Sequence, residues 1–147
     1  SSRLYRRLVD QDRVAIAVNG YVGPEGFDPG LVKLFVTVSP EKSPDAAEVA
    51  LSDELARIGR SGPSREELQK AKNTRLAAHW RRLKTIDSKA EWLGIFEVFR
   101  GDYRKLFTAP DRYDPVTRAA VQALAKKLFD ERNRTVGGLV PEKESSR

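Results

Sequence analysis

We predict that a long helix begins in the stretch Gly62-Pro63-Ser64-Arg65-Glu66-Glu67-Leu68-Gln69-Lys70-Ala71-Lys72-Asn73. Ser64 is a good N-cap, because its hydroxyl can accept a hydrogen bond from an unpaired N–H of the first turn. Glu67 lies three residues later and can accept from the Ser64 N–H, which completes a capping box. The helix should extend from about Arg65 to about Lys84, with apolar residues at helical spacing at Leu68, Ala71, Leu76 and Leu83.

The composition is that of a chain that folds as one domain. It has 147 residues, of which 39% are hydrophobic and 33% charged, and no apolar run approaches the roughly 20 residues that span a bilayer. The chain has no Met and starts at Ser1 without an apolar signal segment, so we interpret it as a piece of a longer polypeptide. Cys is absent as well, which excludes disulfides and thiolate chemistry.

The net charge of +6 allows an acidic partner such as nucleic acid. The basic residues are spread along the chain, however, and no motif of stacking aromatic residues accompanies them. We therefore interpret the charge as a solvated, arginine-rich surface and expect no nucleic-acid partner. Salt-sensitive retention on DNA would reverse that interpretation.

Periodicity and turn signals predict the elements before the long helix. A short amphipathic helix runs from Arg3 to about Gln11, and alternation predicts a strand at 14–18. A Gly/Pro-rich turn at 23–30 leads to a second strand, 31–39, which should pair antiparallel with the first. Ser43-Pro44 then opens a helix that ends at Gly59 or Gly62, with its apolar side at Ala46, Val49, Ala50, Leu55 and Ile58.

The same signals predict the elements after it. A helix from Ser88 to Arg100 ends at Gly101, and Asp102 caps a short helical turn through Phe107. Trp92 and Phe96 on the 88–100 helix are the residues that we expect at the centre of the core. Residues 110–115 form a loop, Thr117 caps a helix carrying Val121, Leu124, Ala125 and Leu128, and residues 135–140 form a last strand stopped by Pro141.

This order of elements predicts an α+β fold, an antiparallel sheet with several helices packed on one face. Three strands are few for so many helices, so the first strands of the sheet are expected to be missing. We predict one partial domain over residues 1–141 and a polar tail over 142–147. Its bare sheet edge should make the fragment self-associate.

A series of motifs in the same order resembles the insulinase/pitrilysin-type zinc metallopeptidases, the family that includes the mitochondrial processing peptidase. The resemblance covers residues 4–141 and implies the C-terminal, non-catalytic half of a two-half peptidase. The motifs that carry it are Arg3-Leu4-Tyr5-Arg6-Arg7-Leu8-Val9, Asp28-Pro29-Gly30-Leu31 with Phe35-Val36-Thr37-Val38, the stretch 62–73, Gly101-Asp102-Tyr103, Val116-Thr117, and Asn133-Arg134-Thr135-Val136-Gly137.

The resemblance places zinc in the other half of the parent protein. The family's catalytic half holds the metal on an H-x-x-E-H helix, where two imidazoles bind it and a carboxylate takes a proton from the bound water. This chain has a single His, His79, which we interpret as a partly exposed helix residue. We therefore expect no catalytic residue, metal ligand or cofactor in the fragment.

In many relatives the non-catalytic half holds the peptide with an Arg after the first helix and a Tyr on the following strand. The corresponding positions here are Val9 and Ile16, both apolar, so this polar clamp is expected to be lost. Arg7 lies roughly 200° around the helix from Val9. Tyr21 is five residues from Ile16 and would face the other side of an unbroken strand.

Two functions follow from the resemblance. The fragment either closes the peptide chamber over a catalytic half, of the same or a paired chain, or belongs to a degenerate paralogue that serves in assembly of a protein complex. An H-x-x-E-H motif upstream in the parent reading frame would decide for the first. The sequence leaves the compartment open, although bacterial relatives are often exported.

We expect the isolated chain to bind no zinc stoichiometrically and to cleave no peptide, since one His and no Cys cannot supply the usual ligand set. Metal analysis after dialysis and a peptidase assay check this expectation. One tightly held zinc per chain, with chelator-sensitive cleavage, would contradict it.

Overall fold

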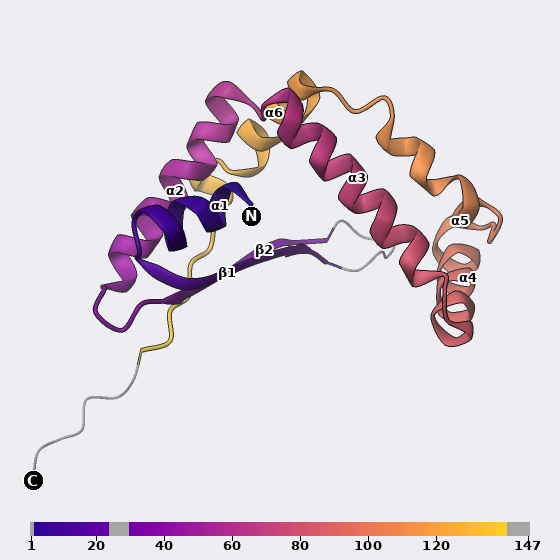
Figure 1. Cartoon of the computed structure of the whole chain (residues 1–147), viewed down its shortest axis with the longest axis horizontal. Helices are drawn as coiled ribbons and strands as arrows, with labels where there is room; N and C mark the ends of the chain where they lie inside the picture. Colours follow the sequence, from indigo (N-terminus) through magenta and orange to yellow (C-terminus); the bar gives the residue numbers. More distant parts are fainter. Residues whose placement is uncertain (1, 24–29, 141–147) are drawn as a thin grey trace, which may run out of the picture.

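The computed structural model describes residues 2–23 and 30–140 and has the α+β fold that the sequence predicts (Figure 1). The turn at 24–29, Pro141 and the tail at 142–147 lie outside the described residues. The elements are α1 (Arg3–Tyr5) continued by the π-helix η1 (Arg6–Gln11), β1 (Ala15–Val22), β2 (Val32–Val38), α2 (Pro44–Ser61), α3 (Arg65–Arg82), α4 (Ile86–Arg100), α5 (Lys105–Thr108), the 3-10 helices η2 (Ala109–Tyr113) and η3 (Glu131–Asn133), and between these two α6 (Arg118–Leu128).

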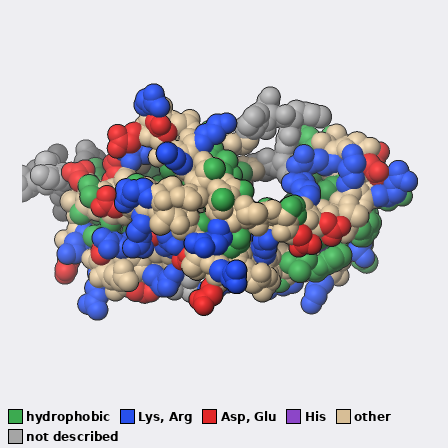
Figure 2. Space-filling model, turned by 90° about the horizontal axis from the view of Figure 1, so that it is seen from above, with side chains coloured by type: hydrophobic (Ala, Val, Ile, Leu, Met, Phe, Trp, Pro, Cys, Tyr) green, Lys and Arg blue, Asp and Glu red, His purple; other side chains and the backbone are tan. Residues whose placement is uncertain are grey.

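The elements form two lobes joined by α3 (Figure 1). One lobe contains the N-terminal helix, the antiparallel β1–β2 pair, α2 and α6; the other contains α4 and α5. The helix α3 buries none of its residues, and the space-filling view shows the molecule hollowed between the lobes (Figure 2). On the face shown there, Lys and Arg side chains are spread among Asp and Glu. No helix among the described residues is long and apolar enough to cross a membrane.

The main hydrophobic core lies where the N-terminal helix, the base of the hairpin and α2 meet. Its buried members are small or medium-sized, and partly buried Val18, Val36 and Val38 of the hairpin pack against them. The sequence-based expectation that Trp92 and Phe96 form the centre is therefore wrong. Phe96 is buried and lies near Trp92, but both belong to the other lobe. The buried core residues are Leu8, Val14, Ala15, Ala47 and Ala50.

The buried stripe of α2 differs from the predicted one. It runs through Ala47, Ala50 and Glu54, whereas Val49 is 61% exposed. The prediction failed because it treated every charged residue as solvated, and Glu54 occupies a core-facing position at 3% exposure. That burial is tolerated because two arginines pair with the carboxylate, as described below.

The last predicted strand is absent. Within the described part, residues 134–140 have no regular structure, and Leu139 and Val140 are largely exposed. The two consecutive glycines in this segment carry no side chain to pack, and no neighbouring strand pairs with it in the described sheet. Arg134 instead ties the segment to α2 through Glu48, at 3.2 Å, and Ser52.

Two boundaries also shift. The helix α4 begins at Ile86, because the Thr85 hydroxyl accepts from the Ser88 N–H and so caps the helix earlier than expected. The predicted 110–115 loop is largely the 3-10 helix η2. The Gly62 end of α2, the Gly101 end of α4 and the Thr117 cap of α6 agree with the predictions.

We expect Leu8→Ala to lower the free energy of unfolding by about 2–5 kcal/mol, because Leu8 is fully buried and its loss leaves a cavity. Val49→Ala, at a position that the sequence pattern assigned to the core, should cost no more than about 0.5 kcal/mol. Urea denaturation followed by circular dichroism measures both. Equal costs would show that the burial pattern of α2 is wrong.

Candidate functional site

The capping box predicted at the start of α3 is present. The Ser64 hydroxyl accepts from the Glu67 N–H at 3.1 Å, and the Glu67 carboxylate accepts from the Ser64 N–H at 2.8 Å. The cap therefore satisfies two N–H groups at the start of the helix.

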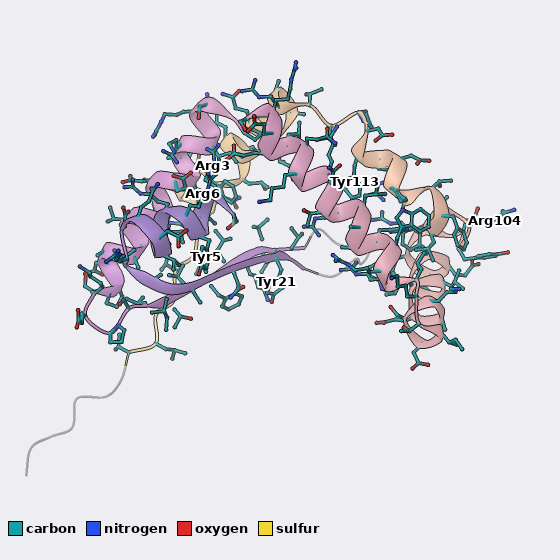
Figure 3. The ribbon with its side chains drawn as sticks, in the orientation of Figure 1. Arg3, Tyr5, Arg6, Tyr21, Arg104 and Tyr113 are labelled. Carbon is teal, nitrogen blue, oxygen red and sulfur yellow. The ribbon has the colours of Figure 1, made fainter. Side chains whose placement is uncertain are left out.

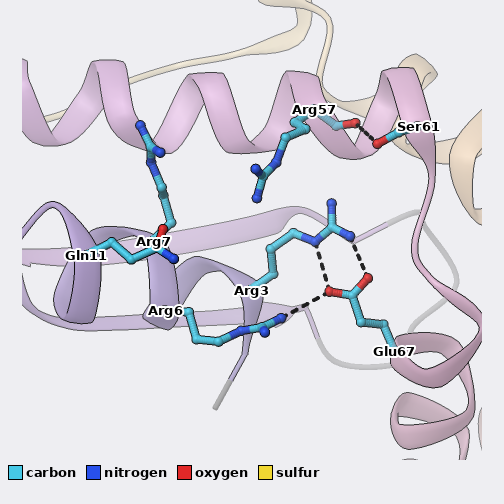
Figure 4. A pocket seen from close by; sticks show the side chains of 7 residues that line it. All are labelled: Arg3, Arg6, Arg7, Gln11, Arg57, Ser61 and Glu67. Carbon is cyan, nitrogen blue, oxygen red and sulfur yellow. Dashed lines mark hydrogen bonds and ion pairs between the residues drawn. The ribbon is translucent and has the colours of Figure 1, made fainter.

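Glu67 also binds the N-terminal helix, which the sequence did not indicate. Its carboxylate accepts from the Arg3 guanidinium at Nε, 3.2 Å, and at Nη2, and from Arg6 Nη2 at 3.2 Å (Figure 4). Arg3 in addition lies 3.4 Å from the buried Glu54 carboxylate, which Arg57 pairs from one turn away at 2.8 Å. One network thus joins the N-terminal helix, α2 and α3.

Electrostatics follow from these contacts. Hydrogen bonds from Arg3 and then from the Ser64 backbone lower the pKa of Glu67 to about 2, despite partial burial. The same Glu67 hydrogen bond raises the pKa of Arg3. Both groups are therefore charged throughout the neutral range.

A cavity of about 310 Å³ opens beside this network (Figure 4). It lies between the N-terminal helix, the last turns of α2 and the first turn of α3. All seven residues that line it are polar or charged: Arg3, Arg6, Arg7, Gln11, Arg57, Ser61 and Glu67.

The structure does not bring the two clamp positions into one polar site. Val9 packs against the hydrophobic core, whereas Ile16 is 58% exposed on β1. Neither side chain can replace the hydrogen bonds of an Arg or a Tyr.

A β-bulge changes the expected position of Tyr21. Ala15 pairs with Val38 and Ala17 with Thr37, so Ile16 is an extra residue in β1. Such an extra residue breaks the strict alternation of side chains between the two faces. Ala15 and Val18 lie on the core side, while Ile16 and Tyr21 share the opposite, uncovered face. The argument from an unbroken strand is therefore wrong for this chain.

The uncovered face of the hairpin carries an aromatic pair, of which Figure 3 labels Tyr21. The Tyr21 and Phe35 rings stack with centroids 5.9 Å apart and planes 9° from parallel, and Lys33 Nζ lies 5.7 Å from the Tyr21 centroid. Tyr21 is 48% and Phe35 54% exposed, so the described part of the chain leaves about half of each ring to solvent. We call Ile16, Tyr21, Lys33 and Phe35 the open hairpin face.

His79 lies on α3 and is partly buried. Burial lowers its pKa, a hydrogen bond to the Leu106 backbone opposes that shift, and Nε2 has no hydrogen-bond partner among the described residues. No group of three His, Cys, Asp or Glu side chains within residues 2–23 and 30–140 is arranged to hold a metal ion. With one imidazole and no thiolate, the residues of this chain do not fit a catalytic zinc site.

Comparison with known families decides the assignment. The family described as peptidase M16 inactive domain matches residues 1–75. The chain belongs to this family. A comparison with proteins of curated function finds no match.

Solved structures agree with the M16 assignment. The M16 inactive domain is similar to the "inactive peptidase domain of a putative zinc protease" from Bordetella parapertussis, with a TM-score of 0.85 and 28% identity over 100% of this chain and 77% of that one. A "putative zinc protease" from Bordetella pertussis Tohama I gives 0.80 and 29%, over 97% of this chain and 76% of that one. A protease from Helicobacter pylori shares the fold, with a TM-score of 0.72 and 20% identity over 86% of this chain but only 30% of that chain.

The resemblance read from the ordered motifs is thus confirmed: this is a C-terminal, inactive half-domain of the M16 type. The Glu67 network and the bulge at Ile16 were missed from the sequence. The first joins residues more than 60 positions apart, and the second depends on strand register.

We expect Glu67→Gln to destabilise the M16 domain by about 1–2 kcal/mol at neutral pH, since it weakens a cap and an ion-pair network. Because folding lowers the pKa of Glu67 from 4.5 to about 2, its contribution is complete above pH 4.5 and is lost as the pH falls towards 2. The difference in melting temperature between wild type and variant should therefore shrink over that range.

The matched control is Glu66→Gln, which removes a charge from the same turn of α3 but leaves the Ser64, Arg3 and Arg6 bonds intact. A pH-dependent loss as large as that of Glu67→Gln would assign the effect to the helix dipole alone.

Proposed function

We propose that this M16 domain is the non-catalytic C-terminal half of a two-half zinc metallopeptidase and closes the peptide-binding chamber over the catalytic half. It would be inactive alone, and zinc would reside in the catalytic half of the same or a paired chain. Family membership and the likeness to inactive domains of zinc proteases support this proposal.

The observation that carries the proposal is the open hairpin face. The helices of the first lobe cover one side of the β1–β2 pair and leave the other side to solvent (Figure 1). Stacked aromatic rings that stay half exposed in a soluble domain are typical of a surface that meets a partner. In the proposed assembly this face would line the chamber and touch the peptide.

One observation favours the alternative, a degenerate paralogue that acts in assembly of a complex. Both clamp positions, Val9 and Ile16, are apolar, and Val9 is packed against the core. A chamber without the polar clamp would have to hold peptide by other side chains. An H-x-x-E-H motif in the parent reading frame, or in a neighbouring gene, separates the two functions.

Self-association of the fragment is also proposed. Within the described residues the sheet has only two strands, so the outer edges of both present unpaired N–H and C=O groups. The experiment below therefore includes light scattering over a dilution series, because a dimer formed through the hairpin would cover the surface proposed for the peptide.

We expect the chain, mixed with an H-x-x-E-H half from the same or a paired chain, to form a complex that cleaves unstructured peptides and loses activity with a chelator. The paired variant Tyr21→Ser with Phe35→Ser should lower kcat/KM by roughly tenfold or more, since large aromatic contacts dominate interface energies. Tyr103→Ser is the control, because Tyr103 is equally exposed, at 49%, but lies outside the hairpin.

Failure to form a complex, or cleavage that does not depend on this chain, would contradict the proposed role. Equal effects of the hairpin and Tyr103 variants would leave chamber closing in place and remove the open hairpin face from peptide contact.

A further inference from the structure

We infer that the arginine-lined cavity between the N-terminal helix and α2 is a binding site for an oxyanion, the carboxylate or phosphate group of a small ligand. The inference does not depend on the proposed function, because neither the open hairpin face nor Val9 or Ile16 contributes a residue to the lining of the cavity (Figure 4).

The composition of the cavity wall is the first support. Four arginines and one glutamate line it, and the remaining two residues are the amide Gln11 and the hydroxyl Ser61. No apolar side chain belongs to the wall, so the space suits a charged group better than a hydrocarbon. The four guanidinium groups outnumber the three carboxylates that pair with them, those of Glu54, Glu67 and Asp12, so a net positive charge remains around the space.

The hydrogen-bonding capacity of these arginines is the second support. Arg6 donates to Glu67 through Nη2 and Arg57 donates to Glu54 through Nη2, whereas Arg7 forms an ion pair with Asp12, with Nε 2.8 Å from Oδ2. Each guanidinium has five N–H donors, and the described part of the chain supplies no acceptor for the other nitrogens of these three residues. Their side chains are 54%, 53% and 38% exposed, so a ligand can reach them.

Arg3 positions the other arginines and is not itself a proposed donor to the ligand. Its Nε and Nη2 both donate to Glu67, and the same Nε lies 3.4 Å from Glu54 Oε1. Glu54 and Glu67 thereby fix the guanidinium groups of Arg3, Arg6 and Arg57 near one another against their mutual repulsion. A charge cluster that is held in place before binding loses little entropy when the ligand arrives.

The geometry of the guanidinium group selects the ligand. Its planar fork matches two oxygens of a carboxylate or a phosphate, whereas a halide offers no such pair. Figure 4 shows the Arg57 side chain reaching from α2 and the Arg7 side chain from the N-terminal helix into the space between these helices. A bound oxyanion would therefore add a polar bridge between two elements that already meet through the Arg3–Glu54 ion pair and the core residues Leu8, Ala47 and Ala50.

Two sources share this chemistry, free phosphate and the acidic side chains of a peptide. The test titrates the intact chain with inorganic phosphate and, separately, with tetraglutamate, and follows binding by calorimetry and by amide chemical shifts of the N-terminal helix. We expect saturable binding with shifts at residues 3–11 and 57–61, and the tighter ligand identifies the source.

The double variant Arg6→Gln with Arg7→Gln should weaken the dissociation constant by roughly tenfold, the loss expected for two charge-assisted bonds. The control is Arg104→Gln with Arg132→Gln, two exposed arginines that pair with Asp102 and Asp130 elsewhere. It removes the same charge and should change the dissociation constant less than about twofold, a negligible difference in free energy.

Arg57→Lys keeps the charge beside the buried Glu54 but removes the fork, and should weaken binding severalfold. This variant decides the matter if the double variant fails to fold. No saturable binding of either ligand, or equal weakening by the control, would overturn the inference and leave only general charge screening.

Discussion

The architecture depends on the carboxylate of Glu67. It accepts hydrogen bonds from the Ser64 N–H at the N-cap of its own helix and from Arg3 and Arg6 of the N-terminal helix. It therefore caps α3 and also sets the orientation of α3 relative to the N-terminal helix. The hydrophobic core cannot take over this task. It consists largely of alanine and valine around Leu8, and α3 contributes no buried residue to it. An exposed ion pair is worth about 0–1 kcal/mol, but here several bonds share one carboxylate and one already ordered cap.

The same network explains the unusual burial of Glu54. A lone carboxylate at 3% exposure would be destabilising, yet Arg3 and Arg57 approach it from two elements. Glu54 and Glu67 hold three of the four arginine side chains that line the cavity, those of Arg3, Arg6 and Arg57, and Asp12 holds the fourth, Arg7. The sequence shows only an excess of Lys and Arg spread along the chain, whereas in the fold three carboxylates gather four of these arginines at one place.

Local signals predicted the fold well. The capping box, the Ser43-Pro44 helix start and the hairpin all depend on residues a few positions apart, and the structure has each of them. The predictions that failed depend on distant contacts. A strand at 135–140 would have required a neighbouring strand to pair with, and the described sheet provides none. Which residues of α2 are buried depends on the arginine partners of Glu54. Which face of the sheet Tyr21 occupies depends on the bulge at Ile16. The polar network beside the cavity could not be predicted, because its residues meet only after folding.

The exposed helix α3 has a consequence for how such a domain can diverge. Because none of its residues is fully buried, substitutions at its exposed positions beyond the Glu67 cap cost the core little as long as the helix persists. Its 18 residues nevertheless set a span of about 27 Å between the lobes, and each inserted or deleted residue would turn the far lobe by about 100°. The sequence of α3 can therefore change during evolution far more freely than its length. Insertions or deletions are tolerated best when they add or remove whole turns of the helix.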